Sequence, residues 1–317
     1  MEEPGDGAGG GVNAVLGGFS ALIAVIAVGW VTARTGVLGD GAAVVLSRLS
    51  FYVATPALLL LTLSDADPSA LFPPGLVATA GSAVLCALLF VAVGRWRWRM
   101  PAAELAIGAL STSYVNAGNL GVAIAVYVLG DASIVAPVLL FQVLVLAPVG
   151  LAVLASSHGR VSPLRLLGQA LRMPVVIGCA LGLVLAGTGW EPPALALRPV
   201  ELLAGLAVPT ALLAYGTSLH GAPRPAAGEA AGQVWLAVAL KAVVQPAAAY
   251  ALGRWALRLD DAALLAVTVT SALPTAQNVF VYATTYDRGV VPARDTILIS
   301  TALSVPVLAA VALVLGS

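Results

Sequence analysis

The sequence predicts an all-helical (all-α) membrane protein, in which ten transmembrane helices form a 5+5 inverted repeat with helices 4 and 9 broken and crossed. Three observations support this fold class: the composition, the length of the apolar segments and an internal repeat. Hydrophobic residues make up 60% of the 317 residues and charged residues only 9%, and the mean hydropathy is +0.99. A soluble chain carries roughly a quarter of its residues as charged side chains. Most of the surface is therefore expected to face lipid.

Ten apolar segments are each long enough to form a membrane-spanning helix. A helix needs roughly 20 apolar residues to cross the hydrocarbon layer, and it closes its backbone hydrogen bonds internally. The predicted spans cover residues 13–33, 42–63, 74–94, 103–129, 132–154, 172–188, 199–219, 233–256, 262–284 and 293–315. The connections between them are too short to hold an inserted soluble domain.

The spans divide the chain into two sets of five helices. Residues 1–12 are acidic and rich in glycine, which predicts a disordered N-terminal tail. The first five-helix repeat covers residues 13–154 and the second covers residues 172–317. The longest connection, residues 155–171, carries two arginines and is predicted to be a cytoplasmic linker.

Arginines are concentrated in the connections that follow the odd-numbered spans. Basic residues in short loops favour the cytoplasmic side of a membrane. The predicted cytoplasmic side carries Arg34, Arg95, Arg97, Arg99, Arg160, Arg165, Arg172, Arg224, Arg288 and Arg294, and the opposite side carries Arg198, Arg254 and Arg258. The protein is therefore predicted to be a multi-pass protein of the cell (inner) membrane, with both termini extracytoplasmic.

The two halves of the chain contain matching residues at nearly constant spacing. The matches include tryptophan, asparagine and proline, which coincide by chance less often than alanine or leucine do. Examples at an offset of 153 are Gly29 with Gly182 and Pro56 with Pro209, and examples at an offset of 159 are Trp96 with Trp255 and Asn119 with Asn278. Because each half holds an odd number of helices, the second copy enters the membrane from the opposite side. Such inverted repeats are typical of secondary transporters, whose sites lie near the membrane midplane where discontinuous helices meet.

Polar residues and helix-weakening residues occur together in the middle of the fourth span. Asn116 and Asn119 are amides in an apolar segment, and Gly118 and Gly121 loosen the helix and allow a close approach of backbone or ligand. A buried amide without a partner costs several kcal/mol in an apolar environment, so these side chains are expected to face a partner or a cavity.

The matching part of the ninth span contains Pro274, Gln277 and Asn278. Pro274 lacks a backbone N–H and clashes with the preceding turn, which predicts a break in this helix. Polar residues also hold neighbouring membrane helices together, so a purely structural seam is the alternative interpretation. The occurrence of polar residues and helix breakers at equivalent positions of both halves favours a substrate-binding site.

Lys241 lies inside the eighth predicted span, about eight residues from its cytoplasmic end. A long basic side chain at this depth can extend toward the headgroups, or it can serve a function inside the protein. If it is functional, Lys241 and the ends of the half-helices make a central cavity favourable for an anion.

The sequence resembles the auxin efflux carrier family of permeases, which includes bacterial malonate transporters. The resemblance covers essentially the whole chain and is carried by residues 116–121, residues 214–219, Lys241 with Pro246, and Pro274 with Asn278. It implies scaffold and transport domains, and a crossover of helices 4 and 9 that holds the substrate. The family usually has a proline shortly after the second glycine of helix 4, where this chain has Ala123.

These features together predict a secondary transporter that moves a small organic anion by alternating access. The predicted substrate is a carboxylate, and the candidate binding residues are Asn116, Gly118, Asn119, Gly121, Lys241, Pro274, Gln277 and Asn278. No cofactor or metal is expected, and coupling to sodium or to protons is left open. The alternatives are a sodium-coupled organic-anion symporter of the bile-acid type and, more remotely, a channel or a receptor-like membrane scaffold.

Other classes of function find little support in the sequence. An enzyme is not expected, because His158 and His220 lie in loops and no His-Glu-x-x-His pattern occurs. The net charge is zero, which gives no basic field for binding nucleic acid. We expect no carboxylate deep in the membrane, since Glu104 lies at the cytoplasmic edge. The expected partners are a small-molecule carboxylate and the lipid bilayer, and a homodimer is compatible with the sequence.

Overall fold

The computed structural model describes residues 20, 23–64, 73–121, 132–156, 172, 174–221 and 224–315. These residues form helices joined by turns, and the sole extended pairing among them is one bridge between Val115 and Thr275. The all-helical class is therefore confirmed. The predicted tail of residues 1–12 and most of the predicted linker of residues 155–171 lie outside the described residues.

The helices follow the predicted spans closely. In chain order they are α2 (Ala42–Leu49), α3 (Thr55–Ser64), α4 (Pro74–Arg97), α5 (Ala102–Ser113), α7 (Ala136–Phe141), α8 (Ala147–Ser156), α10 (Pro174–Thr188), α11 (Ala194–Ala204), α12 (Ala207–Leu219), α13 (Ala231–Ala239), α14 (Gln245–Ala251), α15 (Asp261–Ala272), α16 (Asn278–Tyr286) and α17 (Val290–Leu315). A further helix, Ile23–Thr35, precedes α2.

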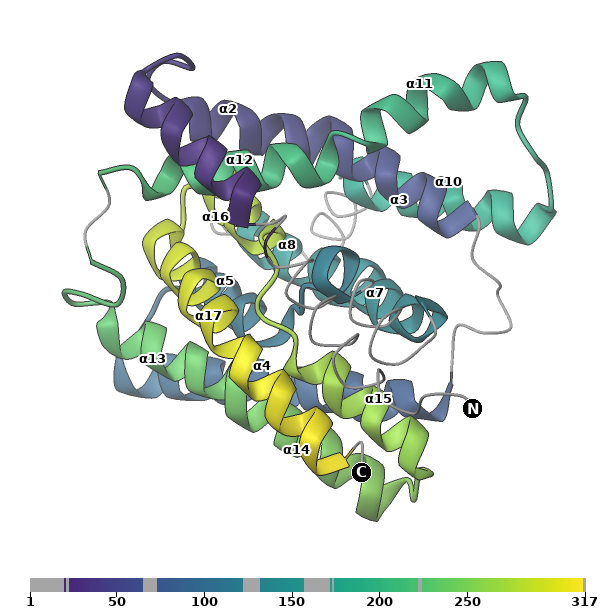
Figure 1. Cartoon of the computed structure of the whole chain (residues 1–317), viewed down its shortest axis with the longest axis vertical. Coiled ribbons are helices and arrows are strands. Elements are labelled where there is room, and N and C mark those ends of the chain that lie inside the picture. Colours follow the sequence, from purple (N-terminus) through teal and green to yellow (C-terminus); the bar gives the residue numbers. More distant parts are fainter. Residues whose placement is uncertain are drawn as a thin grey trace, which may run out of the picture.

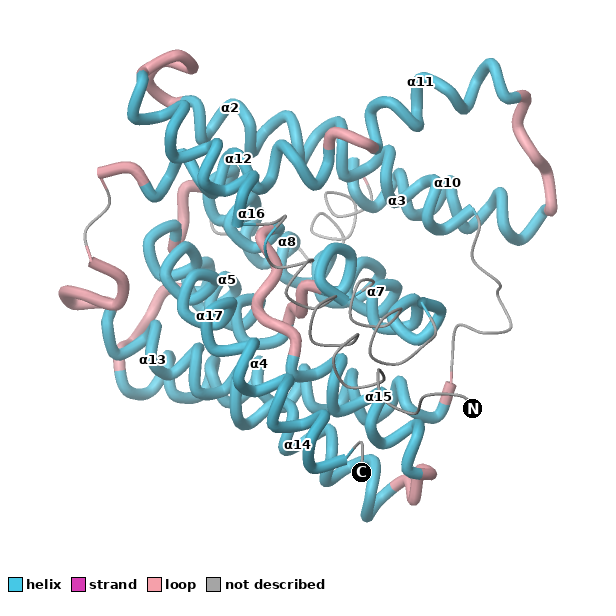
Figure 2. The backbone as a smooth tube through the Cα atoms, viewed as in Figure 1, coloured by secondary structure: helices cyan, strands magenta, loops and turns pink. Residues whose placement is uncertain are grey.

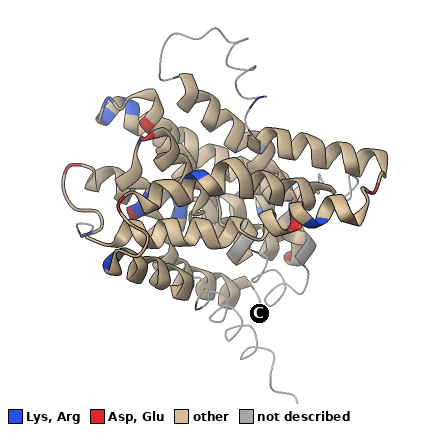
Figure 3. Ribbon diagram, turned by 90° about the horizontal axis from the view of Figure 1, so that it is seen from above, with Lys and Arg blue, Asp and Glu red and all other residues tan. Residues whose placement is uncertain are grey.

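Several of these helices join into segments that can cross a membrane. Among the described residues, six segments are long and apolar enough: Ala42–Ser64, Pro74–Arg97, Pro137–Ser156, Ala194–Leu219, Ala231–Ala256 and Val290–Leu315. Shorter apolar helices cover Ile23–Thr35, Val176–Thr188 and Asp261–Ala272. Most of the ribbon carries no charged residue (Figure 3). The protein is thus a multi-pass membrane protein, and the count of ten spans stays a prediction.

Three of the long segments contain a π-helical turn just before a proline. Proline has no N–H and its ring clashes with the carbonyl four residues earlier, so widening the preceding turn relieves the clash. Gln142 and Lys241 are both located on such turns. The turns are Ser50–Ala54, Gln142–Leu146 and Leu240–Val244, and the prolines that follow them are Pro56, Pro148 and Pro246.

The helices are arranged in two main layers (Figure 1). In one layer α3 packs against α10 and α11, and α2 packs against α12. In the other layer α4 packs against α5, α14 and α15, and α17 packs against α13 and α15. The segment from α7 to α8 and the short helix α16 lie between the layers (Figure 1).

Glycines allow helices of the first layer to approach closely. A Cβ atom on Gly182 of α10 would lie 2.6 Å from the carbonyl oxygen of Leu60 in α3. A Cβ atom on Gly29 would lie 2.6 Å from the carbonyl oxygen of Leu213 in α12. Small residues are the usual way to bring membrane helices together, because lipid supplies no hydrophobic force between them. The two contacts involve residue pairs that the offset of 153 relates to each other.

The second layer contains a similar pair of matching turns. Arg99 after α4 and Arg258 after α14 have positive φ angles of 51° and 52°. The N–H of Met100 donates to Gly94 at 3.1 Å, and the N–H of Leu259 donates to Gly253 at 3.0 Å. The offset of 159 relates all of these positions, so the sequence repeat corresponds to a repeated local structure.

We predict that Gly182→Ala destabilises the protein, because the added methyl group meets the Leu60 carbonyl oxygen. The expected cost is about 1–3 kcal/mol, the range for overpacking a close contact. A lower melting temperature in detergent would show it. The matched control is Gly187→Ala in the same helix, where a Cβ atom meets nothing within 4 Å. An equal loss in both variants would contradict the packing explanation.

Candidate functional site

Two helices are interrupted in the middle of the molecule, and the interruptions lie against each other. Helix α5 ends at Ser113 and a helical turn resumes at Ala117–Gly121, whereas α15 ends at Ala272 and α16 begins at Asn278. Figure 2 draws the interrupted segments as loops inside the helical bundle. The first break thus lies at residues 114–116, upstream of Gly118, Gly121 and Ala123.

The two breaks satisfy each other's backbone groups. The N–H of Asn116 donates to the carbonyl of Pro274 at 2.8 Å, and the N–H of Ala276 donates to the carbonyl of Tyr114 at 3.1 Å. Broken helices leave N–H and C=O groups without partners, and such groups are costly away from water. Reciprocal pairing removes this cost for both breaks at once.

Side chains from the following helices complete the pairing. The N–H of Val115 donates to the amide oxygen of Gln142, and the N–H of Thr275 donates to the hydroxyl of Ser300 in α17 at 3.2 Å. The Thr275 hydroxyl donates to the carbonyl of Ser111 in the last turn of α5 at 2.6 Å. The central residues of both breaks are therefore held by backbone and side-chain hydrogen bonds.

A cavity of about 150 Å³ lies between the crossing segments and the first layer. Helix α3 and the start of α12 form one side, while the two breaks and the α7 segment form the other. The described polar residues that line it are Thr55, Thr62, Tyr114, Asn116, Gln142, Gln277 and Asn278. No charged side chain is found among the described lining residues. The cavity therefore offers neutral hydrogen-bonding groups in an otherwise apolar setting.

An amide pair connects the two breaks at the cavity wall. The amide nitrogen of Asn116 donates to the amide oxygen of Gln277 at 3.0 Å. Asn116 and Gln277 are buried, exposing 2% each. The amide nitrogens of Gln142 and Gln277 are buried without a hydrogen-bond partner. Among the described residues, the lining of the cavity thus includes two amide donors that have no hydrogen-bond partner.

The structure brings together four of the predicted site residues at the cavity: Asn116, Gly118, Gln277 and Asn278. Pro274 contributes its carbonyl to the backbone pairing, and Gly121 faces Leu273 and Val135 instead of the cavity. The side chain of Asn119 lies outside the described residues, although its helical turn is described.

Four polar lining residues were missed by the sequence analysis: Thr55, Thr62, Tyr114 and Gln142. Threonine and tyrosine are ordinary residues of helix surfaces, so their pattern gives no signal. Gln142 does give a signal in the sequence, because an amide within an apolar span is costly without a partner.

Lys241 lies apart from the lining of this cavity. Its side chain is fully buried, and its ammonium group donates to the amide oxygen of Gln245 and to the carbonyl of Ser271 at 3.4 Å. Ser271 is in the last turn of α15, where helix carbonyls carry partial negative charge. Lys241 thus stabilises the end of α15 next to the break, and the alternative of an ammonium extended toward the headgroups does not describe this structure.

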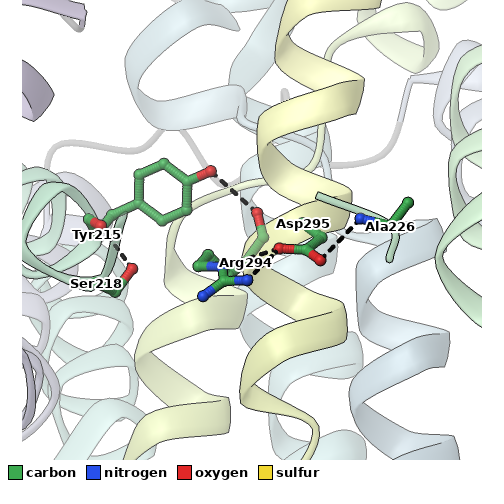
Figure 4. Close-up of polar contacts among 5 residues, drawn as sticks. All are labelled: Tyr215, Ser218, Ala226, Arg294 and Asp295. Carbon is green, nitrogen blue, oxygen red and sulfur yellow. Dashed lines mark hydrogen bonds and ion pairs between the residues drawn. The ribbon is translucent and has the colours of Figure 1, made fainter. Parts of the chain in front are cut away.

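A buried ion pair lies at the start of α17 (Figure 4). The guanidinium of Arg294 is 2.7 Å from the carboxylate of Asp295, which also accepts the N–H of Ala226 at 3.0 Å. The hydroxyl of Tyr215 in α12 donates to the carbonyl of Arg294 at 3.0 Å. Asp295 exposes only 2% of its surface, and the adjacent arginine compensates its charge. The position is near the start of α17, at an end of the predicted span, so the expectation of no carboxylate deep in the membrane stays a prediction.

A small polar cavity between two layers of membrane helices, at the junction of paired helix breaks, is typical of the class of membrane transporters. A model of the membrane transport protein family matches residues 19–163 and 158–311. The chain therefore belongs to this family, which confirms the resemblance to the auxin efflux carriers. A protein of Rhizobium meliloti (strain 1021), provisionally named a malonate transporter, is 28% identical over 290 residues, 89% of each chain.

We predict that Asp295→Ala strongly destabilises the protein, because it leaves the Arg294 guanidinium buried without its carboxylate. Removing one partner of a buried pair costs about 3–5 kcal/mol, which a thermal melt of the purified protein would detect. The control is Arg254→Ala, since Arg254 forms an exposed ion pair with Asp261. Exposed pairs contribute at most about 1 kcal/mol, so similar melting shifts in the two variants would refute the prediction.

Proposed function

We propose that this protein is a secondary transporter that moves a small carboxylate across the cell membrane by alternating access. The observation that carries the proposal is the cavity beside the paired breaks, which contains buried amide donors without acceptors. An ionised carboxylate has only acceptor atoms, so it matches this set of groups. The proposed substrate would supply the hydrogen bonds that the cavity residues lack.

The carboxylate is proposed to bind at the crossing of the two breaks. Asn116, Gln277 and Asn278 provide side-chain amides there, and Asn278 is the first residue of α16. A helix N-terminus carries partial positive charge, which favours an anion. Gly118 lines the same cavity and leaves space for the ligand. We retain Asn119 in this set as a proposal from the sequence.

Lys241 is proposed to act on the substrate through its charge and without contact. It is held at the end of α15 by Gln245 and Ser271 and is absent from the described lining of the cavity. Charges interact over several ångströms when little water lies between them. Its ammonium therefore raises the potential at the cavity in favour of an anion.

The size of the cavity restricts the substrate to a small molecule. A cavity of about 150 Å³ holds a ligand of roughly six or seven non-hydrogen atoms, since an engineered protein cavity of that volume binds benzene. A three-carbon dicarboxylate has seven such atoms. The name of the relative from Rhizobium meliloti makes malonate the first substrate to test.

Alternating access is supported by the position of the cavity between the two layers. We propose that the layer of α2, α3, α10, α11 and α12 is the scaffold, and that the layer of α4, α5, α13, α14, α15 and α17 moves. The matching contacts of Gly29 and Gly182 support an inverted repeat. The family matches also divide near residue 160, within the proposed linker of residues 155–171.

The proposal also covers the orientation of the protein in the membrane and the ion that drives transport. The arginine distribution supports extracytoplasmic termini. Lys241, next to a break but outside the described lining of the cavity, provides a positive charge of the protein's own near the site. A sodium-coupled symporter remains the second candidate within transporters. Uptake measured with and without sodium, and with and without a proton gradient, separates the two.

The test is uptake of labelled malonate into proteoliposomes by wild-type protein, Asn116→Ala and Asn278→Ala. Loss of either amide is expected to reduce uptake at least tenfold, because a hydrogen bond to a charged group contributes about 1.5–3 kcal/mol. Both variants should still insert and purify normally. The control, Gln233→Ala, removes an amide that is absent from the lining of the cavity. Normal uptake by both cavity variants would disprove the site.

A further inference from the structure

We propose that Gln142 positions the substrate in the cavity: its amide oxygen holds the break at residues 114–116, and its amide nitrogen donates to the substrate carboxylate. The inference rests on the proposed function and adds a residue that the sequence analysis did not identify. Gln142 would thus have two roles, one in supporting the helix break and one in binding the substrate.

The orientation of the Gln142 amide is determined by its partner. A backbone N–H can only donate, so the atom that faces the N–H of Val115 must be the amide oxygen. The amide nitrogen is therefore directed away from Val115. In the pair of Asn116 and Gln277, by contrast, both amides can be exchanged without losing the hydrogen bond.

The unpaired amide nitrogen of Gln142 belongs to a residue of the cavity lining. Gln142 exposes 1% of its surface, lines the cavity of about 150 Å³, and its amide nitrogen has no hydrogen-bond partner. Buried polar groups are nearly always paired, so an unpaired one calls for an explanation. Gln142 also borders a second pocket of about 10 Å³, which is too small for a carboxylate. The larger cavity is the one of the two with room for a carboxylate, and we assign the missing acceptor to a ligand bound there.

Ser300 shows what a purely structural version of this arrangement looks like. Its hydroxyl accepts the N–H of Thr275, which mirrors the contact between Gln142 and Val115 across the two breaks. The Ser300 hydroxyl then donates to the carbonyl of Ile297 at 3.3 Å. Ser300 is absent from the described lining of the cavity. Of these two residues, Gln142 both supports a break and lines the cavity.

The decisive variant is Gln142→Glu, because glutamate keeps an oxygen for the N–H of Val115 and replaces the amide nitrogen. The protonated acid still donates a hydrogen bond, whereas the carboxylate cannot donate and repels an anionic substrate. We expect the ratio of variant to wild-type malonate uptake to fall about tenfold or more from low to high pH, the loss of one charged hydrogen bond. The KM for malonate should rise over the same range.

The control is Ser300→Ala, which removes the mirrored support without touching a cavity donor. We expect it to lower the melting temperature and to leave the shape of the pH profile as in wild type. A constant ratio of Gln142→Glu to wild-type uptake across the pH range would overturn the role of Gln142. The same pH dependence in Ser300→Ala would overturn it as well.

The two proposals fail in different ways. If wild-type protein neither takes up malonate and related carboxylates nor is stabilised by them in thermal melts, the proposed function falls and the role of Gln142 falls with it. If the wild type transports a carboxylate and only the pH response of Gln142→Glu is absent, the transporter stands and the positioning role does not.

Discussion

The structure depends on the reciprocal backbone pairing of two broken helices. An interrupted helix is stable inside a membrane only when its free backbone groups find hydrogen-bond partners. Here each of the two breaks supplies partners for the other. The pairing of Val115 with Thr275 fixes where both breaks occur. It also brings Asn116 and Gln277 together, so the position of the polar site follows from a backbone constraint.

Side chains around the pairing form hydrogen bonds with the remaining backbone groups of the two breaks. Gln142 and Ser300 accept the backbone N–H groups that the pairing leaves over, and Thr275 and Lys241 stabilise the carbonyl ends of α5 and α15. Two of these groups, on Gln142 and Lys241, lie on π-helical turns that prolines induce. Sites in membrane transporters are built where helices are interrupted, and here Gln142 both supports an interruption and lines the cavity.

Much of this site could be predicted from the sequence, and the exceptions have physical reasons. Pro274 predicts the break in its own helix. Asn116, Gln277 and Asn278 are amides, which an apolar span tolerates only where they face a partner or a cavity. The break at residues 114–116 has no such local signal, since it is imposed by pairing with residues far away in the sequence. Gly121, a candidate binding residue from the sequence, packs against Leu273 in this structure. The burial of Asp295 was missed because it results from packing with residues far away in the sequence, such as Tyr215 and Ala226.

The hydrogen bond from Tyr215 to the carbonyl of Arg294 joins α12 of one layer to α17 of the other. If the layers shift during transport, this bond exists in one state and is absent in the other. A single hydrogen bond contributes about 1 kcal/mol, which corresponds to roughly a fivefold change in the ratio of two conformations. Under the proposed alternating access, one phenolic hydroxyl outside the described lining of the cavity thereby shifts the relative populations of two conformations.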